Sequence, residues 1–293
     1  MKLQTPVADA DCKVCISYED KITMLGSCFS DNIGKQLKDF GFDVCVNPFG
    51  TMYNPISILR SVERLISRKE FTLEDCVRIG AGDDRFCSFS HHTSFARKEA
   101  VEFIENANQA LMAAADHFAS STKVIITLGT SWCFRHESGK VVSNCLKRPA
   151  AEFTRERLSA GDTADCLRRI MEICQEAAGN EGFAEKEFIF TVSPIRHFKD
   201  GAHGNQLSKA SLLLGIEEAL AATPVDLSMN PRYKADYFPA YEIVMDELRD
   251  YRFYAEDMCH PTQQTADYIC ERFLDWALPA DEQDTLKENI RTF

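Results

Sequence analysis

Two short segments, far apart in the sequence, carry side chains suited to nucleophilic chemistry. The first is Gly26-Ser27-Cys28, which offers a hydroxyl and a thiol beside a glycine. The second is Asp257-Met258-Cys259-His260, in which a carboxylate stands three residues before an imidazole. A histidine can take the proton of a hydroxyl or thiol, and a carboxylate can orient its other ring nitrogen. If the fold brings the two segments together, they form a nucleophile–base–acid triad.

The pattern of apolar residues predicts the elements that position these segments. Lys21–Leu25 has the composition of a strand that stops at Gly26, and the apolar stripe that follows predicts a helix over 29–40. Val124–Leu128 is β-branched without polar alternation, which is typical of a parallel strand covered on both faces. We expect further strands at 42–46 and 187–192, and helices at 56–66, 97–118, 153–178 (most of it), 207–222 and 261–278.

This alternation of strands and helices predicts an α/β fold with a central parallel sheet. Gly80, Gly82 and Asp83-Asp84 mark a hairpin excursion over about 71–95, and Glu137-Ser138-Gly139-Lys140 marks the turn of a second hairpin. No linker interrupts the sequence. We therefore predict one domain over 1–293, with insertions at about 71–95 and 134–185 and a C-terminal helix.

Composition narrows the classes of partner. The 293 residues hold 33 Lys and Arg against 45 Asp and Glu, a formal charge of −12, which argues against a general nucleic-acid binder. No apolar run approaches the roughly 18 residues of a membrane span, and no signal peptide is visible, so a cytoplasmic location is expected. The 12 cysteines are expected to be free thiols.

Neither a metal nor an organic cofactor is predicted. Cys12-x-x-Cys15 has metal-like spacing, but no second Cys pair or close His pair accompanies it, and a structural zinc needs four ligands. Gly80-Ala81-Gly82 lacks the following helix and lysine of a phosphate-binding loop.

Side chains near the ends of strands are candidates for substrate contact. Ligands of parallel α/β sheets collect beyond the carboxyl ends of the strands. Arg196 and His197 follow the strand at 187–192, and there they could hold a carboxylate, a phosphate or a sugar hydroxyl. An ion pair with an acidic side chain is the alternative for Arg196. His92, in the hairpin excursion, could overhang the site, or it could belong to a solvated pair with His91.

Several motifs, taken together, resemble a known family. Gly26-Ser27-Cys28-Phe29-Ser30 resembles the signature of the GSCFA-domain family, a bacterial branch related to the SGNH (GDSL-like) hydrolases. The likeness continues through 47–55, 127–130, 191–197, 205–209, 246–254 and 257–261, and so covers about 22–276.

The resemblance implies the flavodoxin-like three-layer α/β/α sandwich of SGNH hydrolases. It implies that Asp257 and His260 supply the acid and base of the triad, and that the Gly50 N–H donates to an oxyanion. Gly129-Thr130-Ser131-Trp132 falls where that superfamily has Gly-x-Asn-Asp. Ser131 therefore replaces an asparagine donor, and Asn54 and Asn144 are the alternative side-chain donors.

The nucleophile motif differs from that of the SGNH superfamily, in which the sequence is Gly-Asp-Ser. On that register Cys28 stands at the nucleophile, and a helix N-terminus is expected to stabilise its thiolate. We favour Cys28. A shift of one residue in the turn would present Ser27 instead. Ser27 could also simply cap the helix while Cys28 is buried.

Three functions follow from these residues. The first is an SGNH-like esterase, acyl hydrolase or acyltransferase, acting on an acyl ester of a carbohydrate or similar small molecule. The second is an inactive ligand-binding module on the same fold, which the missing asparagine at Ser131 motivates. The third is a thiol-based transferase that uses Cys28, for which a low-pKa, accessible thiol is expected.

Overall fold

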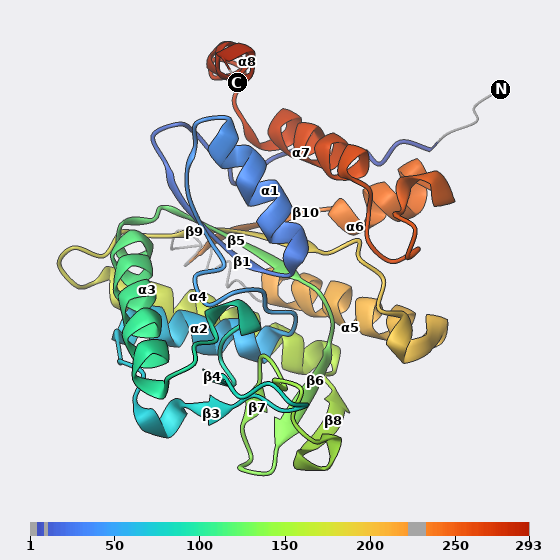
Figure 1. The fold of residues 1–293 in the computed structure, drawn as a ribbon. Coiled ribbons are helices and arrows are strands. Elements are labelled where there is room, and N and C mark those ends of the chain that lie inside the picture. Colours follow the sequence, from blue (N-terminus) through green and yellow to red (C-terminus); the bar gives the residue numbers. More distant parts are fainter. Residues whose placement is uncertain (1–4, 9–10, 222–232, 293) are drawn as a thin grey trace.

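The core of the molecule is a five-stranded parallel sheet (Figure 1). The computed structural model describes residues 5–8, 11–221 and 233–292. The strands of the sheet lie in the order β2-β1-β5-β9-β10, so that β1 has a neighbouring strand on each side. Their bounds are Lys21–Gly26 (β1), Asp43–Val46 (β2), Lys123–Leu128 (β5), Glu187–Val192 (β9) and Lys234–Phe238 (β10).

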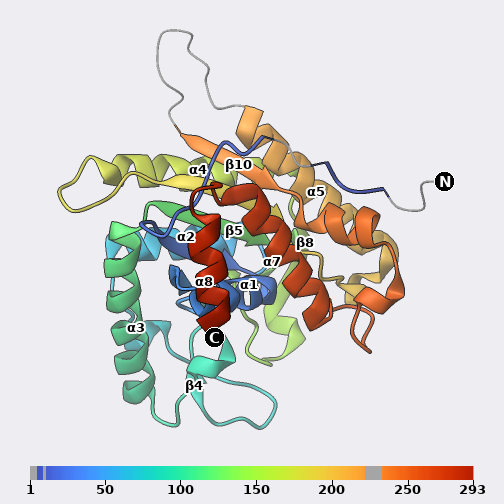
Figure 2. The same cartoon turned by 90° about the horizontal axis from the view of Figure 1, so that it is seen from above.

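Helices cover both faces of the sheet, which confirms the three-layer sandwich (Figure 1). One face carries α1 (Cys28–Asp39), α7 (Gln263–Ala277) and the short α6 (Ala240–Glu242), and Figure 2 shows α8 (Gln283–Thr292) on the same side. The other face carries α2 (Pro55–Ser67), α3 (Ala100–Ser120), α4 (Ala160–Ala178) and α5 (Gly201–Ala221). Among the residues that the structure describes, no helix is long and apolar enough to cross a lipid bilayer.

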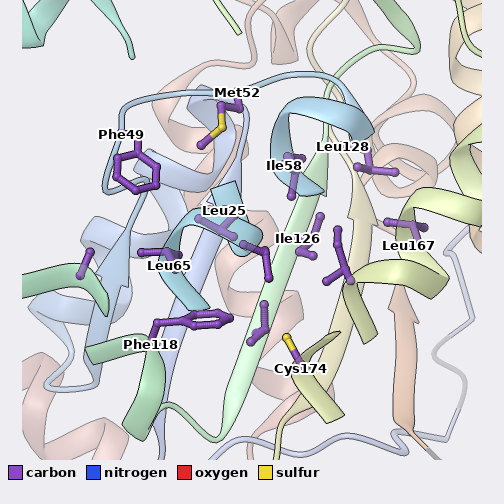
Figure 3. Packing of buried hydrophobic residues seen from close by; sticks show 14 of the residues in the cluster. Leu25, Phe49, Met52, Ile58, Leu65, Phe118, Ile126, Leu128, Leu167 and Cys174 are labelled. Carbon is purple, nitrogen blue, oxygen red and sulfur yellow. The ribbon is translucent and has the colours of Figure 1, made fainter. Parts of the chain in front are cut away.

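Two hydrophobic layers form because successive side chains of a strand point to opposite faces. Val124, Ile126 and Leu128 of β5 pack toward α2, α3 and α4, whereas Ile125 packs toward α1 and α7. Figure 3 shows Leu25 and Ile126 among side chains of the first layer, including Leu65 of α2. This double coverage explains the uninterrupted apolar run of β5.

The insertions form two small antiparallel sheets. The excursion at 71–95 contains β3 (Val77–Arg78) and β4 (Phe86–Cys87), and the second insertion contains β6 (Trp132–His136), β7 (Val141–Val142) and β8 (Phe153–Arg157). The helix expected over 153–178 is therefore wrong at its start. Residues 153–157 pair along their whole length with β6, and this long-range pairing outweighs their local helical pattern.

Other elements were not predicted. These are β10, α8 and a π-helical turn at Ile243–Leu248, which follows α6. The helix expected to begin at 207 begins at Gly201, and the last long helix begins at Gln263 and not at 261. That residues 1–293 form one domain stays a prediction.

Candidate active site

The predicted site segments gather at the carboxyl edge of the sheet. Gly26, Thr127 and Thr191 are neighbours in register across β1, β5 and β9, so the loops that follow these strands emerge side by side. They carry Ser27-Cys28, Gly129–Trp132 and Ser193–His197. Gly26 allows the strands to approach closely, since a Cβ there would lie 2.1 Å from the Thr127 carbonyl oxygen.

Asp257 and His260 form a hydrogen-bonded pair within one tight loop. Asp257 Oδ1 accepts the N–H groups of Cys259 and His260, both at 2.9 Å, and His260 Nδ1 lies 2.5 Å from Asp257 Oδ2. The two N–H groups and the ring lower the pKa of Asp257 to about 2. Because an ionised carboxylate can only accept, Nδ1 donates the proton in this hydrogen bond, and a neutral ring then has Nε2 as its proton acceptor.

The His260 loop is accessible to solvent and is tied to the carboxyl edge of the sheet. The side chains of His260 and Asp257 are 54% and 50% exposed, so a substrate can reach them. The Cys259 carbonyl accepts the Arg196 N–H at 3.0 Å, which ties the loop to the end of β9. Just beyond it, Gln263 of α7 accepts a hydrogen bond from Asn32 of α1 at 3.3 Å. These contacts bring the His260 loop and the first turns of α1 to the same edge.

Ser27 is the N-cap of α1 and is buried. The residue is 1% exposed, and its Oγ accepts the Phe29 N–H at 3.3 Å. Its own N–H donates to the Thr127 carbonyl at 3.2 Å. The Ser27 hydroxyl thus caps the helix, and its N–H bonds to the end of β5. These contacts support a capping role for Ser27.

Cys28 is more accessible than Ser27, but the expectation of a stabilised thiolate is wrong. Burial, followed by the negative charge of Asp31, raises the pKa of the Cys28 thiol above its usual value. The helix N–H groups and the nearby Tyr53 hydroxyl oppose the shift without cancelling it. The resting side chain is thus a protonated thiol, which requires a base before it can attack.

Replacing Asp31 with asparagine should therefore make Cys28 more reactive. Removal of the like charge lowers the thiol pKa, and we expect the alkylation of Cys28 by iodoacetamide at pH 7 to accelerate about three- to tenfold. Peptide mapping by mass spectrometry measures the rate at Cys28, with Cys45 as internal reference. Asp39→Asn, at the far end of the same helix, is the matched control; an equal acceleration in that variant would contradict the account.

Tyr53 is a site residue that the sequence did not single out. Its carbonyl accepts the N–H groups of Gly129 and Thr130, both at 2.9 Å, and its ring fills the space that a side chain at 129 would need. Its hydroxyl lies 3.3 Å from Thr51 Oγ1 and is near enough to the Cys28 thiol to affect the pKa of that thiol. Tyr53 is thus fixed against the end of β5 with its hydroxyl toward the thiol.

Lys209 of α5 is the second such residue. It is fully buried, and its Nζ donates to the carbonyls of Gly129 and Ser193, both at 2.7 Å. Burial lowers its pKa to about 7, with the nearby Cys28 acting in the opposite direction. Lys209 joins the ends of β5 and β9 directly beneath the candidate site.

The predicted oxyanion donors are mostly used elsewhere. The Gly50 N–H donates to the Asn47 carbonyl at 2.7 Å, and Ser131 is buried with its N–H donating to Ser208 Oγ at 2.8 Å. Asn54 caps α2 through Ser57. Asn144 contacts Phe89 and Leu146 in the hairpin region.

The predicted substrate-contact residues lie at the edge of the site. The ring of His197 is 6.0 Å from that of Tyr53, its Nε2 is buried without a partner among the described residues, and burial lowers its pKa to about 4. The Arg196 guanidinium lies over the Phe198 ring and not in an ion pair with a described residue. His92 is exposed, packs against Gly50 and faces Asp31, whereas His91 is buried.

Comparisons with known proteins identify the family of this protein. Neither a search of curated proteins nor a search of solved structures gave a match. The model of the GSCFA family matches residues 21–273, a span that includes both segments of the candidate site. The protein therefore belongs to the GSCFA family.

Proposed function

We propose that the protein is an esterase or acyltransferase in which Cys28 is the nucleophile, His260 the general base and Asp257 the residue that orients His260. The observation that carries this proposal is the Asp257–His260 pair, which is half exposed and lies at the edge of the sheet where α1 and Cys28 begin. The likeness to SGNH hydrolases supports the proposal by analogy. By the same analogy we propose a carbohydrate ester as the substrate.

The reaction proceeds in two halves. His260 Nε2 takes the Cys28 proton as the sulfur attacks the ester carbonyl carbon, and the tetrahedral intermediate then expels the alcohol, which receives that proton from His260. Water, or an acceptor alcohol, next gives its proton to His260 and attacks the thioester carbon. Release of the acid or the new ester returns the proton to the Cys28 sulfur. Because the resting thiol is protonated, the base is essential to the first half.

Two groups near the Cys28 sulfur are suited to donate hydrogen bonds to the oxyanion of the tetrahedral intermediate. The Cys28 N–H, in the first turn of α1, makes no hydrogen bond to another described residue. The Tyr53 hydroxyl, held beside Cys28, can donate the second hydrogen bond. A tyrosine thus takes the place of the amide and glycine donors that the sequence suggested.

Tyr53→Phe tests this role because it removes only the hydroxyl. We expect kcat for p-nitrophenyl acetate to fall about 10²-fold with little change in KM, as for loss of one oxyanion donor. Circular dichroism and a melting curve check that the variant folds. A variant that keeps its wild-type kcat would remove Tyr53 from the mechanism.

The Asp–His pair itself is tested by hydrolysis of p-nitrophenyl acetate and a panel of acetylated sugars. We expect His260→Ala to lose about 10³-fold or more and Asp257→Asn about 10²-fold or more. His117→Ala is a matched control, because His117 also pairs with an aspartate, Asp43, at 3.1 Å, but at the opposite edge of the sheet. Equal losses in this control would assign the effect to stability and not to catalysis.

A ligand-binding module is the second candidate function. It is favoured by the internal use of the Gly50, Asn54 and Ser131 groups, and by the lack of a hydrogen bond between Cys28 and His260 among the described contacts. It predicts sugar binding without turnover of any ester in the panel. The thiol-transferase hypothesis is disfavoured, since it requires a low-pKa thiol and the pKa of Cys28 is raised.

A further inference from the structure

A cavity of about 620 Å³ opens beside the His260 loop, between α5 and the segment from α6 to Tyr254. We call it the tyrosine–arginine cavity after the residues that dominate its wall, which are Arg196, Arg249, Tyr241, Tyr251, Tyr254 and Lys209. This volume lies within the usual range for small-molecule sites. A larger cavity, of about 660 Å³, lies between α2 and the hairpins, and none of the described residues that line it belongs to the candidate active site.

The tyrosine–arginine cavity adjoins the proposed catalytic residues at two points. The Arg196 N–H holds the carbonyl of Cys259, the residue before His260, and Tyr254 forms a β-bridge with Pro261, the residue after it. Lys209 belongs to both the cavity wall and the ends of β5 and β9. A ligand in the cavity therefore lies against the His260 loop.

The charges on the cavity wall are incompletely paired. The Arg196 guanidinium stacks 4.3 Å from the Phe198 ring centroid, and its Nε is buried without a partner among the described residues. Arg249 is exposed and makes no ion pair with a described residue. Two carboxylates also line the cavity, but Asp250 pairs with Arg252 at 2.8 Å, which leaves Asp246 alone to oppose both guanidiniums.

The wall chemistry fits a ring that carries an oxyanion. Tyrosine rings and the apolar side chains of Leu213, Val244 and Met245 offer apolar surface for the C–H face of a sugar or for an aromatic ring. Arginine binds carboxylate or phosphate through paired N–H donors. We infer that the tyrosine–arginine cavity binds a carboxylate or phosphate group on the substrate, with Arg196 as its main anchor. The assignment of this anion to the substrate rests on the proposed esterase function; the anion site itself does not.

Binding is measured by calorimetry on the full chain carrying Cys28→Ala, so that no turnover interferes. The ligands are glucuronate, glucose 6-phosphate and glucose, which distinguish a carboxylate from a phosphate and both from a neutral sugar. We expect at least one anionic sugar to bind about tenfold or more tightly than glucose. Arg196→Met should abolish this preference, and the exposed Arg249→Met, which leaves the core intact, should weaken it several-fold.

Arg169→Met is the matched control, because Arg169 is exposed on α4 and paired with Glu172 and Glu176 outside this cavity. Equal affinity for glucose and both anions overturns the inference, as does a folded Arg196→Met variant that keeps the anion preference. These results are independent of ester hydrolysis by the wild type. Anion binding in the absence of any hydrolysis would therefore overturn the proposed function and leave the anion site standing.

Discussion

Cys28→Ala is expected to lower the rate of ester hydrolysis about 10⁴-fold or more, whereas Ser27→Ala is expected to stay near the wild-type rate. The first change removes the proposed nucleophile, and no other described group occupies its place in the first turn of α1. The second removes a buried N-cap, so it should lower the free energy of unfolding by about 1 kcal/mol and leave the chemistry intact.

Steady-state kinetics with p-nitrophenyl acetate and urea unfolding measure the two effects. Cys45→Ala is a suitable control, since Cys45 is another partly buried thiol with a raised pKa and lies in β2. A folded Ser27→Ala variant without activity, alongside an active Cys28→Ala variant, would reverse the assignment of the nucleophile.

Lys209 is expected to make the stability of the wild type increase with pH above neutrality. Burial holds the pKa of Lys209 at about 7 in the folded state, against an ordinary value of 10.5. Between these values the unfolded chain binds a proton that the folded chain does not, so the free energy of unfolding rises with pH. Below about pH 7 both states are protonated and this dependence disappears.

Comparing the wild type with Lys209→Met isolates the contribution of Lys209 to the pH dependence of the free energy of unfolding. Each pH unit adds up to about 1.4 kcal/mol to the free energy of unfolding. Between pH 7 and 9 the free energy of unfolding of the wild type should therefore rise by about 2–3 kcal/mol more than that of the variant. Other titrating groups, including the buried Lys186, are common to both proteins and cancel in the difference. The variant loses two hydrogen bonds and starts less stable. Urea unfolding at each pH gives the slopes, and parallel slopes would contradict a buried lysine at this position.

The strands that are buried on both faces could be predicted from their local sequence alone. β5 and β9 are covered on both faces, so their apolar runs stand out whatever surrounds them. β10 and β8 were not predicted, because charged residues interrupt them. In β10 Asp236 is buried, where it accepts the Lys13 N–H at 2.7 Å, and β8 is stabilised by pairing with β6. Such partners come from distant parts of the chain.

The candidate site was predictable where the chemistry is local. Asp257 and His260 form their hydrogen bond within one loop, and their spacing alone suggested it. Tyr53 depends on the crossing of the 47–54 loop with the end of β5, which no local pattern reveals. Lys209 did leave a signal, because it falls on the buried helical stripe with Leu212, Ile216 and Ala219.

The expected thiolate at Cys28 shows why residue type and element are insufficient. A helix N-terminus favours negative charge, but here burial and Asp31, three residues along the same helix, act against it. The position of Asp31 is visible in the sequence. The packing of Cys28 against the hydrophobic layer of α1 and α7 becomes visible only in the fold.

The most direct test of the proposed triad is to trap its covalent intermediate. The wild-type protein is mixed with p-nitrophenyl acetate, quenched in acid within the first turnovers and mapped by peptide mass spectrometry. The account predicts an acetyl group on Cys28, at a level that depends on His260 and is absent from Cys28→Ala. Acetylation at Ser27, or hydrolysis that proceeds without any acetyl group on Cys28, would contradict it.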